Sequence, residues 1–278
     1  MKPPEAMSAG PLAREPEAAA SPSPPRVRAF ELDALRGLAV LMMMLHHFAF
    51  DLRYFLGLDV FAFQERPWFQ YLLRPLFVAV FLTVSGICCS FSRDNLKRGL
   101  RMLAAAAVLT AVTTAASLLT HTDLFIFFNV IHLIAVGTLL YAWMERRDAR
   151  RVPGKREARL AVSAILSVSL IFLGGVIERF GPVSNDWLLP LGWATDTALR
   201  VMSDYMPLLP WLGFFFSGAV LGLLLYRERR SLFPGAPRRL VRAAAPLGFL
   251  GRHALVFYLL HQPVILGILI LLRRAGVI

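Results

Sequence analysis

The sequence has very little cysteine, which excludes a fold held together by disulfide bonds. Among its 278 residues only Cys88 and Cys89 are cysteines. They are adjacent within an apolar run, where they cannot link an extracellular loop and are typical of packing inside a membrane. The sequence also lacks a Walker loop, a dinucleotide-type glycine fingerprint and a GxSxG elbow. ATP-driven transport, nicotinamide redox chemistry and soluble-hydrolase chemistry therefore have no support.

Acidic residues are also scarce, with 18 Asp and Glu against 30 Lys and Arg, for a formal charge of +12. Most of the basic residues lie in short connections between apolar runs, so the charge follows the positive-inside pattern and predicts no nucleic-acid partner. The histidines show neither HxxxH nor HExxH spacing. We therefore expect no metal site.

Apolar residues dominate what is present. They make up 57% of the chain, and the mean hydropathy is +0.59. Runs of about 20 apolar residues match the hydrocarbon thickness of a bilayer, which predicts an all-α polytopic membrane protein. We expect about seven transmembrane helices, near 29–50, 70–92, 99–119, 124–144, 158–178, 207–226 and 249–272. Residues 185–203 are interrupted by Pro190, Gly192, Asp196 and Arg200, which favours a re-entrant or interfacial segment over an eighth span.

The chain is expected to have two parts. Residues 1–27 are rich in proline and alanine and have no apolar periodicity, which indicates a disordered tail. Residues 28–278 form the transmembrane domain. No removable signal peptide is expected before the first span, which we predict is kept as an anchor.

The distribution of basic residues predicts the topology. The tail and the second, fourth and sixth connections are rich in Lys and Arg, whereas the odd-numbered connections are poor in them, so the N-terminus is expected in the cytoplasm. Only Arg273 and Arg274 fall on the unexpected side. This topology places Arg36 near the cytoplasmic face. It brings His47, His132 and Asp204 to similar depth in the outer half of the membrane.

The first span carries a polar stripe. Arg36 and His47 are eleven residues apart, so on a helix they lie within about 20° of one face and about 16 Å apart along the axis. Charged and polar groups at this depth cost several kcal/mol unless they are paired or hydrated. The stripe is therefore either a structural ion pair of Asp33 with Arg36 plus interfacial histidines, or a functional surface. In the second case Arg36 suits phosphate and His47 suits proton transfer.

Several motifs resemble a known family. The run of Asp33, Arg36 and Gly37 followed by His46 and His47 resembles the opening of transmembrane acyltransferases, in which Arg, ten residues and then His recur. More specifically, the chain resembles the bacterial family related to the catalytic domain of heparan-α-glucosaminide N-acetyltransferase. The matching segments are Phe81–Gly86, Phe128–His132, Asp204–Trp211 and Leu250–Pro263.

The resemblance implies that an acetyl group passes from cytosolic acetyl-CoA to an amino sugar or a hydroxyl acceptor on the far side of the membrane. It assigns the roles as follows: catalytic His47, His132 and Asp204; cofactor-binding Arg36, Asp33, Ser85 and Arg252; substrate-binding Asn129, Tyr205, Trp211 and His261. The partners implied are acetyl-CoA, a carbohydrate or other small acceptor, and the lipid bilayer, with a homo-oligomer left open. The compact chain points to a bacterial inner membrane.

The animal enzyme of this family is described with an acetyl-carrying histidine in its first luminal loop, and residues 52–69 contain no histidine. This departure favours direct transfer, with His47 as general base and Asp204 or His132 orienting the acceptor. Two other interpretations stay open. One is a proton-coupled small-molecule transporter in which the same histidines relay protons. The other is a membrane scaffold without chemistry, which leaves the intramembrane polar groups unexplained.

Overall fold

The computed structural model describes residues 29–123, 125–148, 155–177, 179–181, 183–202 and 204–277. Within them the chain forms helices and no β-strand, and an isolated bridge pairs Phe125 with Met202. The expected all-α class is therefore confirmed for the described residues. The predicted tail, residues 1–27, lies outside them.

Each expected span coincides with a long helix. These are α1 (Phe30–Phe50), α2 (Arg74–Ile87), α3 (Asn95–Thr120), α4 (Val130–Asp148), α5 (Lys155–Ile177), α7 (Trp211–Leu225) and α10 (Ala254–Arg274). Three shorter helices are α6 (Asp196–Val201), α8 (Arg238–Ala243) and α9 (Ala245–Arg252). Five described helical segments are long and apolar enough to cross a membrane, and α7 is a shorter apolar helix. The chain is thus an integral membrane protein, while the number of seven spans and the cytoplasmic N-terminus stay predictions.

Several helix boundaries differ from those expected, among them the start of α4 and the end of α2. Helix α4 begins at Val130 rather than at 124, because the Asn129 side chain accepts a hydrogen bond from the Ile131 amide and Phe128 accepts one from Met206. Helix α2 ends at Ile87 rather than at 92, and hydrogen-bonded turns follow it. Residues 185–203 contain the 3₁₀ turn Leu189–Leu191 and α6. Whether they re-enter a membrane stays a prediction.

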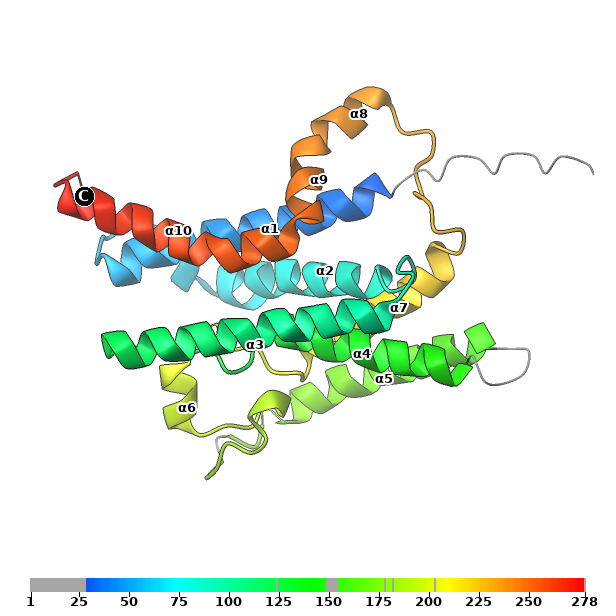
Figure 1. Ribbon diagram of the computed structural model, residues 1–278, viewed down its shortest axis with the longest axis horizontal. Coiled ribbons are helices and arrows are strands. Elements are labelled where there is room, and N and C mark those ends of the chain that lie inside the picture. The colour runs from blue at the N-terminus through cyan, green and yellow to red at the C-terminus, as the bar shows by residue number, and fades with distance from the viewer. Residues whose placement is uncertain are drawn as a thin grey trace, which may run out of the picture.

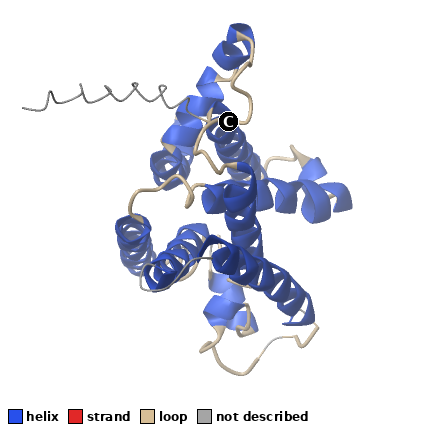
Figure 2. Ribbon diagram, turned by 90° about the vertical axis from the view of Figure 1, so that its right-hand side faces the viewer, coloured by secondary structure: helices blue, strands red, loops and turns tan. Residues whose placement is uncertain are grey.

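The long helices lie side by side along the longest axis of the molecule (Figure 1). Helix α1 packs on α9, α10 and α2, and α2 packs on α7. Helix α3 packs on α4, and α5 packs on α7. Figure 2, turned by 90°, shows the same helices nearly end-on as a bundle, with other segments projecting from it. Helices α1, α2, α3, α4 and α10 therefore surround the space in which the polar residues gather.

The described parts of the basic connections lie at one end of this bundle (Figure 1). There Asn95 at the start of α3 donates to Glu145 near the end of α4 over 2.8 Å, and Arg159 of α5 pairs with the same carboxylate at 3.0 Å. Ser231, after α7, donates to Glu31 at the start of α1 over 2.8 Å. We call this the basic end, and the opposite one the far end.

The contact between α1 and α9 depends on two glycines. A Cβ atom on Gly37 would stand 1.8 Å from the carbonyl oxygen of Leu247, and one on Gly251 would stand 1.9 Å from that of Asp33. Only hydrogen fits at either position, so the two backbones touch directly. Small residues allow this kind of close helix packing inside a membrane.

A larger side chain at Gly37 is expected to separate α1 from α9. The substitution Gly37→Val should lower the free energy of unfolding by about 3 kcal/mol, because the neighbouring atoms belong to a backbone that cannot rotate away. The measurement is thermal unfolding of the detergent-purified chain. Gly267→Val in α10 is the matched control, since nothing lies within 4 Å of a Cβ atom there. Equal melting temperatures for the two variants would contradict this account of the contact.

Candidate functional site

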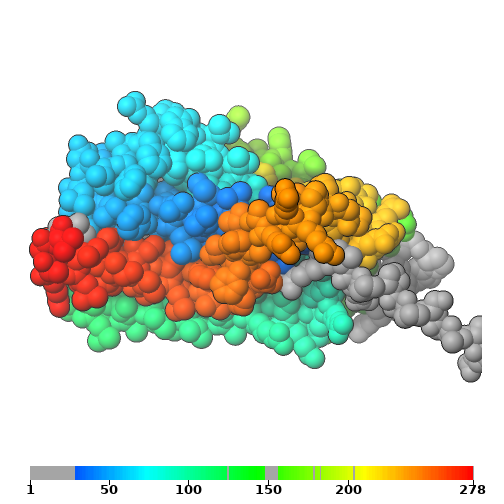
Figure 3. All heavy atoms as spheres, turned by 90° about the horizontal axis from the view of Figure 1, so that it is seen from above, coloured from blue at the N-terminus to red at the C-terminus, as the bar shows by residue number. Residues whose placement is uncertain are grey.

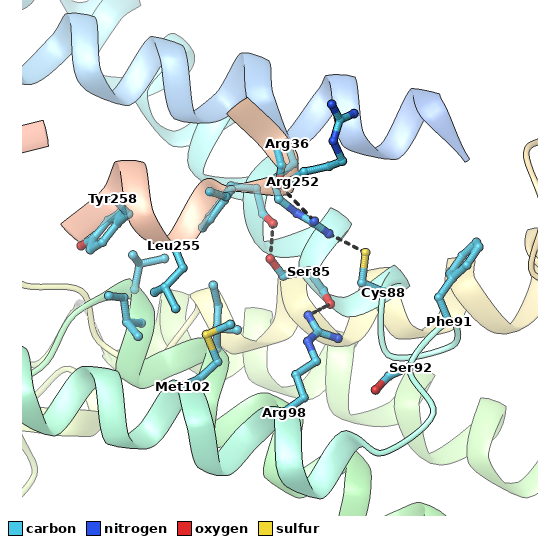
Figure 4. Close-up of a pocket in the computed structure, with 16 residues that line it drawn as sticks. Arg36, Ser85, Cys88, Phe91, Ser92, Arg98, Met102, Arg252, Leu255 and Tyr258 are labelled. Carbon is cyan, nitrogen blue, oxygen red and sulfur yellow. Dashed lines mark hydrogen bonds between the residues drawn. The ribbon is translucent and has the colours of Figure 1, made fainter. Parts of the chain in front are cut away.

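A cavity of about 360 Å³ opens among α1, α2, α3, α4, α9 and α10 toward the basic end (Figure 4). Its polar lining residues include three arginines, Arg36 from α1, Arg98 from α3 and Arg252 from α9. The wall is otherwise mainly apolar and aromatic, with Tyr258 of α10 among the lining residues. We call this space the arginine cavity. Its volume is in the range of small-molecule sites.

Two of the arginines contact only neutral groups in the cavity wall. Arg36 donates to the Sγ atom of Cys88 and, over 3.4 Å, to the carbonyl oxygen of Gly251. Arg98 donates to the carbonyl oxygen of Ser85 over 3.2 Å and lies 3.7 Å from the Sγ atom of Cys89. No carboxylate among the described residues pairs with either guanidinium group. A permanent positive charge that is half-buried without a counter-charge favours an anionic ligand.

Ser85 and Arg252 line the same cavity, as expected for cofactor-binding residues, but Asp33 does not. The Ser85 hydroxyl donates to the carbonyl oxygen of Phe81 over 2.8 Å, so it fixes the turn of α2 that Arg98 contacts. Asp33 is buried at the contact between α1 and α9, where its carbonyl oxygen lies against Gly251. Its position supports helix packing rather than contact with a ligand in the cavity.

A second group of polar residues is connected by hydrogen bonds on the far side of Tyr258. The Tyr258 hydroxyl donates to the Oδ2 atom of Asp204 and accepts from the Nδ2 atom of Asn129 over 3.0 Å. Asn129 is fully buried and also lies 2.9 Å, through its Oδ1 atom, from the Nδ1 atom of His132. These four residues come from α10, α4 and the segments before α4 and α7, and we call them the polar cluster.

His261 and His47 lie beside this cluster. His261 is buried one turn after Tyr258 and contacts its carbonyl oxygen through Nδ1 over 2.7 Å. The ring of His47 lies 5.0 Å from the ring of His261, centroid to centroid. The ring of His46 packs instead on Phe69 at 5.4 Å. The two adjacent histidines therefore point in different directions, as expected for neighbours on a helix, and of the two His47 packs against His261.

The polar cluster continues toward α3. The Nε2 atom of His132 lies 3.2 Å from the hydroxyl of Thr110, and that hydroxyl donates to the carbonyl oxygen of Ile126 over 2.8 Å. Because Thr110 donates its proton to Ile126, its oxygen can accept a hydrogen bond from the Nε2–H of His132, and Nδ1 of that tautomer accepts from the Asn129 backbone amide over 3.3 Å. The imidazole is thus held at both nitrogens, which fixes the orientation of its ring.

Tyr258 connects the arginine cavity with the polar cluster. Its side chain lines the cavity, whereas its hydroxyl makes the hydrogen bonds to Asp204 and Asn129. In Figure 4 the hydroxyl points away from Arg36 and Cys88. The two groups of residues therefore meet at the two sides of one aromatic ring, with cationic groups on one side and acid, amide and imidazole on the other.

Two residues expected to bind the acceptor lie elsewhere. The Tyr205 hydroxyl donates to the carbonyl oxygen of Leu189 over 2.5 Å, and burial raises the pKa of Tyr205 to about 12, so the phenol stays a neutral donor. Trp211 begins α7 and packs on Phe214, with 5.7 Å between ring centroids. Both residues hold the segment that carries Asp204, and neither takes part in the hydrogen bonds of the polar cluster.

Sequence analysis did not single out two residues of the site. Arg98 was counted among the basic residues of a connection, and its place in the cavity depends on the packing of α3 against α2. Tyr258 lies within the motif Leu250–Pro263 and precedes His261 by three residues. That spacing places both residues on one face of a helix, which is the sign in the sequence that Tyr258 lies near His261.

The arrangement can bind an anion at one end and move protons at the other. Histidine and carboxylate side chains are suited to general acid–base chemistry near neutral pH. Among the described residues no group of His, Cys, Asp and Glu has the arrangement of a metal site. Group transfer to a nucleophile that loses a proton is one chemistry that such residues can support.

Comparison with protein families gives one match. A family model described as "Heparan-alpha-glucosaminide N-acetyltransferase, catalytic" matches residues 28–263. This range includes every residue of the arginine cavity and of the polar cluster. Neither a comparison with curated proteins nor one with solved structures gave a significant match.

Removing the Tyr258 hydroxyl tests whether the polar cluster is one unit. Tyr258→Phe removes the hydrogen bonds that the Tyr258 hydroxyl makes with Asp204 Oδ2 and Asn129 Nδ2, so the free energy of unfolding should fall by about 1–3 kcal/mol. The measurement is chemical or thermal unfolding in detergent, with Tyr71→Phe as control because Tyr71 is exposed. A Tyr258→Phe variant as stable as the control would show that these hydrogen bonds do not hold the cluster together.

Proposed function

Because the chain belongs to the family of the heparan-alpha-glucosaminide N-acetyltransferase catalytic domain, we propose that it transfers an acetyl group from cytosolic acetyl-CoA to an amino-sugar or hydroxyl acceptor near the outer side of the membrane. Acetyl-CoA is a polyanion with a long, flexible thioester arm. The single observation that carries this assignment is the pair Arg36 and Arg98, two half-buried cations without a described counter-charge in a cavity that ends at Tyr258.

In this proposal the basic end faces the cytoplasm and receives the phosphates of acetyl-CoA. Guanidinium groups suit phosphate because their donors form a planar fork and their charge is permanent. Ser85, Arg98 and Arg252 surround the thioester arm, and the arginine cavity leads it toward Tyr258. A site that binds the donor in this direction presents the acetyl carbon to the polar cluster.

The transfer needs a base on the acceptor side. The acceptor nitrogen or oxygen forms a bond to the acetyl carbon while the bond from that carbon to sulfur breaks. The proton of the acceptor passes to a base, and the thiolate leaves with the electron pair and takes up a proton. We assign the base to His47, with Asp204 and His132 orienting the acceptor, and Tyr258 as the positioning residue that holds Asp204. Asn129 and His261 then contact the acceptor.

Direct transfer fits this arrangement better than a covalent acetyl-histidine. Residues 52–69, the first connection after α1, contain no histidine that could carry the acetyl group. His47 lies instead within α1, packed against His261. A bacterial inner membrane is the expected location, and the oligomeric state is left open.

The cationic end can be tested separately from the chemistry. Arg36→Gln and Arg98→Gln should each weaken acetyl-CoA binding about tenfold or more, since a tenfold loss corresponds to about 1.4 kcal/mol for one charge-assisted contact. The measurement is calorimetric titration of the detergent-purified chain with acetyl-CoA. Arg273→Gln at the end of α10 is the control. Unchanged binding in both cavity variants would overturn the placement of the donor.

The choice of His47 as base can be tested against its neighbour. His47→Ala should abolish acetyl-CoA consumption in membranes supplied with amino sugars or alcohols, while acetyl-CoA binding persists, because the base is absent and the cationic end is intact. His46→Ala is the matched control and should retain turnover. Normal turnover in His47→Ala would remove this residue from the mechanism. Uptake of a solute driven by a pH gradient, without acetyl-CoA binding, would favour a transporter instead.

A further inference from the structure

A second, larger depression lies outside the site described above. It measures about 690 Å³ and is formed by the start of α1, the segment 232–237 and the helices α8 and α9. Its walls include Leu35 and Leu38 of α1, Phe233, and Leu240 of α8. These four side chains remain 43%, 43%, 58% and 55% exposed. We call it the apolar groove.

The one charged residue in the lining does not make the groove polar. Glu31 accepts hydrogen bonds from the Ser231 hydroxyl over 2.8 Å and from the Leu232 amide over 2.9 Å. Its carboxylate therefore anchors the segment that closes the groove and is buried. What the groove offers to a ligand is hydrocarbon surface.

The position of the groove is that of a membrane interface. Helices α8 and α9 lie across the start of α1 and project sideways from the bundle, rather than continuing its axis (Figure 1). Seen from above, their atoms lie over those of α1 (Figure 3). A helix that crosses a transmembrane bundle sideways near one end lies where acyl chains meet headgroups.

Helix α8 divides its surface between apolar and basic residues. Leu240 lies in α8, Ala244 at the junction of α8 and α9, and Leu247 in α9, and all three line the groove. Arg238, Arg239 and Arg242 occupy the rest of the helix and are exposed. No carboxylate among the described residues forms a salt bridge with these arginines. The groove thus has a hydrocarbon wall, and the three arginines, which do not line it, form a positive rim on the other faces of α8.

We propose that the apolar groove binds one anionic phospholipid, with an acyl chain between α1 and α8 and the headgroup phosphate at the α8 arginines. Charge complementarity selects this occupant, because a neutral hydrophobic ligand would leave the basic rim unused and a soluble anion would leave the groove unused. Clusters of basic residues beside a transmembrane helix attract anionic lipids in the same way.

The test measures lipid retention by native mass spectrometry of the detergent-purified full chain. The probes are phosphatidylglycerol and phosphatidylcholine with identical acyl chains. The wild-type chain should retain phosphatidylglycerol about 25-fold better, since Arg239 and Arg242 beside an anionic headgroup each contribute about a factor of five. Arg239→Gln with Arg242→Gln should abolish this preference. The matched control, Arg273→Gln with Arg274→Gln, removes the same charge at the far end and should keep it.

A groove-filling variant separates the hydrocarbon wall from the charged rim. Ala244→Trp leaves the arginines in place but occupies the groove, so retention of both lipids should fall about tenfold or more. Equal retention of the two lipids by the wild type, or loss of the preference in the control, overturns the proposal. So does undiminished phosphatidylglycerol retention in Ala244→Trp. A lipid-free dimer that covers the groove would identify a second copy as its occupant and also overturn it.

Discussion

The structure depends on holding two guanidinium groups inside a membrane bundle with no carboxylate of the described residues paired to them. Arg36 and Arg98 enter the same cavity from α1 and α3, and each contacts only sulfur and carbonyl groups of the neighbouring helices. Taking a permanent charge out of water costs free energy that neutral partners offset only in part. The fold keeps both charges in one cavity although their desolvation lowers its stability. An anion that binds between them removes much of this cost, which is why these residues are the strongest sign of a ligand.

Close helix packing determines where the two halves of the site meet. Gly37 and Gly251 bring the backbones of α1 and α9 into contact, and Tyr258 follows in α10, the helix that continues from α9. The position of Tyr258 therefore depends on residues that make no contact with any ligand. Its hydroxyl in turn holds Asp204, which lies on a connection rather than a helix. A small change at the helix contact would move the acid at the other end of the cluster.

Much of this was accessible from the sequence because helical periodicity is local. The spacing of Arg36 and His47 predicted that they share one helical face. The same ten-residue interval, together with the later motifs, indicated the family, which the match over residues 28–263 confirms. The starts and ends of helices were less accessible, since the residues before α4 are held partly by distant ones, Asn129 by Tyr258 and Phe128 by the amide of Met206. Arg98 and Tyr258 were missed for the same reason. Each gains its role from a partner distant in the chain, and no pattern within one helix encodes that contact.

The ring of Tyr258 also affects whether ions can leak through the protein across the membrane. In the proposed function one substrate arrives from each side, which requires openings toward both, and a continuous opening would short-circuit the ion gradients that the membrane maintains. Tyr258 lies between the arginine cavity and the polar cluster, and its hydrogen bonds to Asp204 and Asn129 hold the ring in place. The same side chain that joins the two halves chemically therefore separates them electrically.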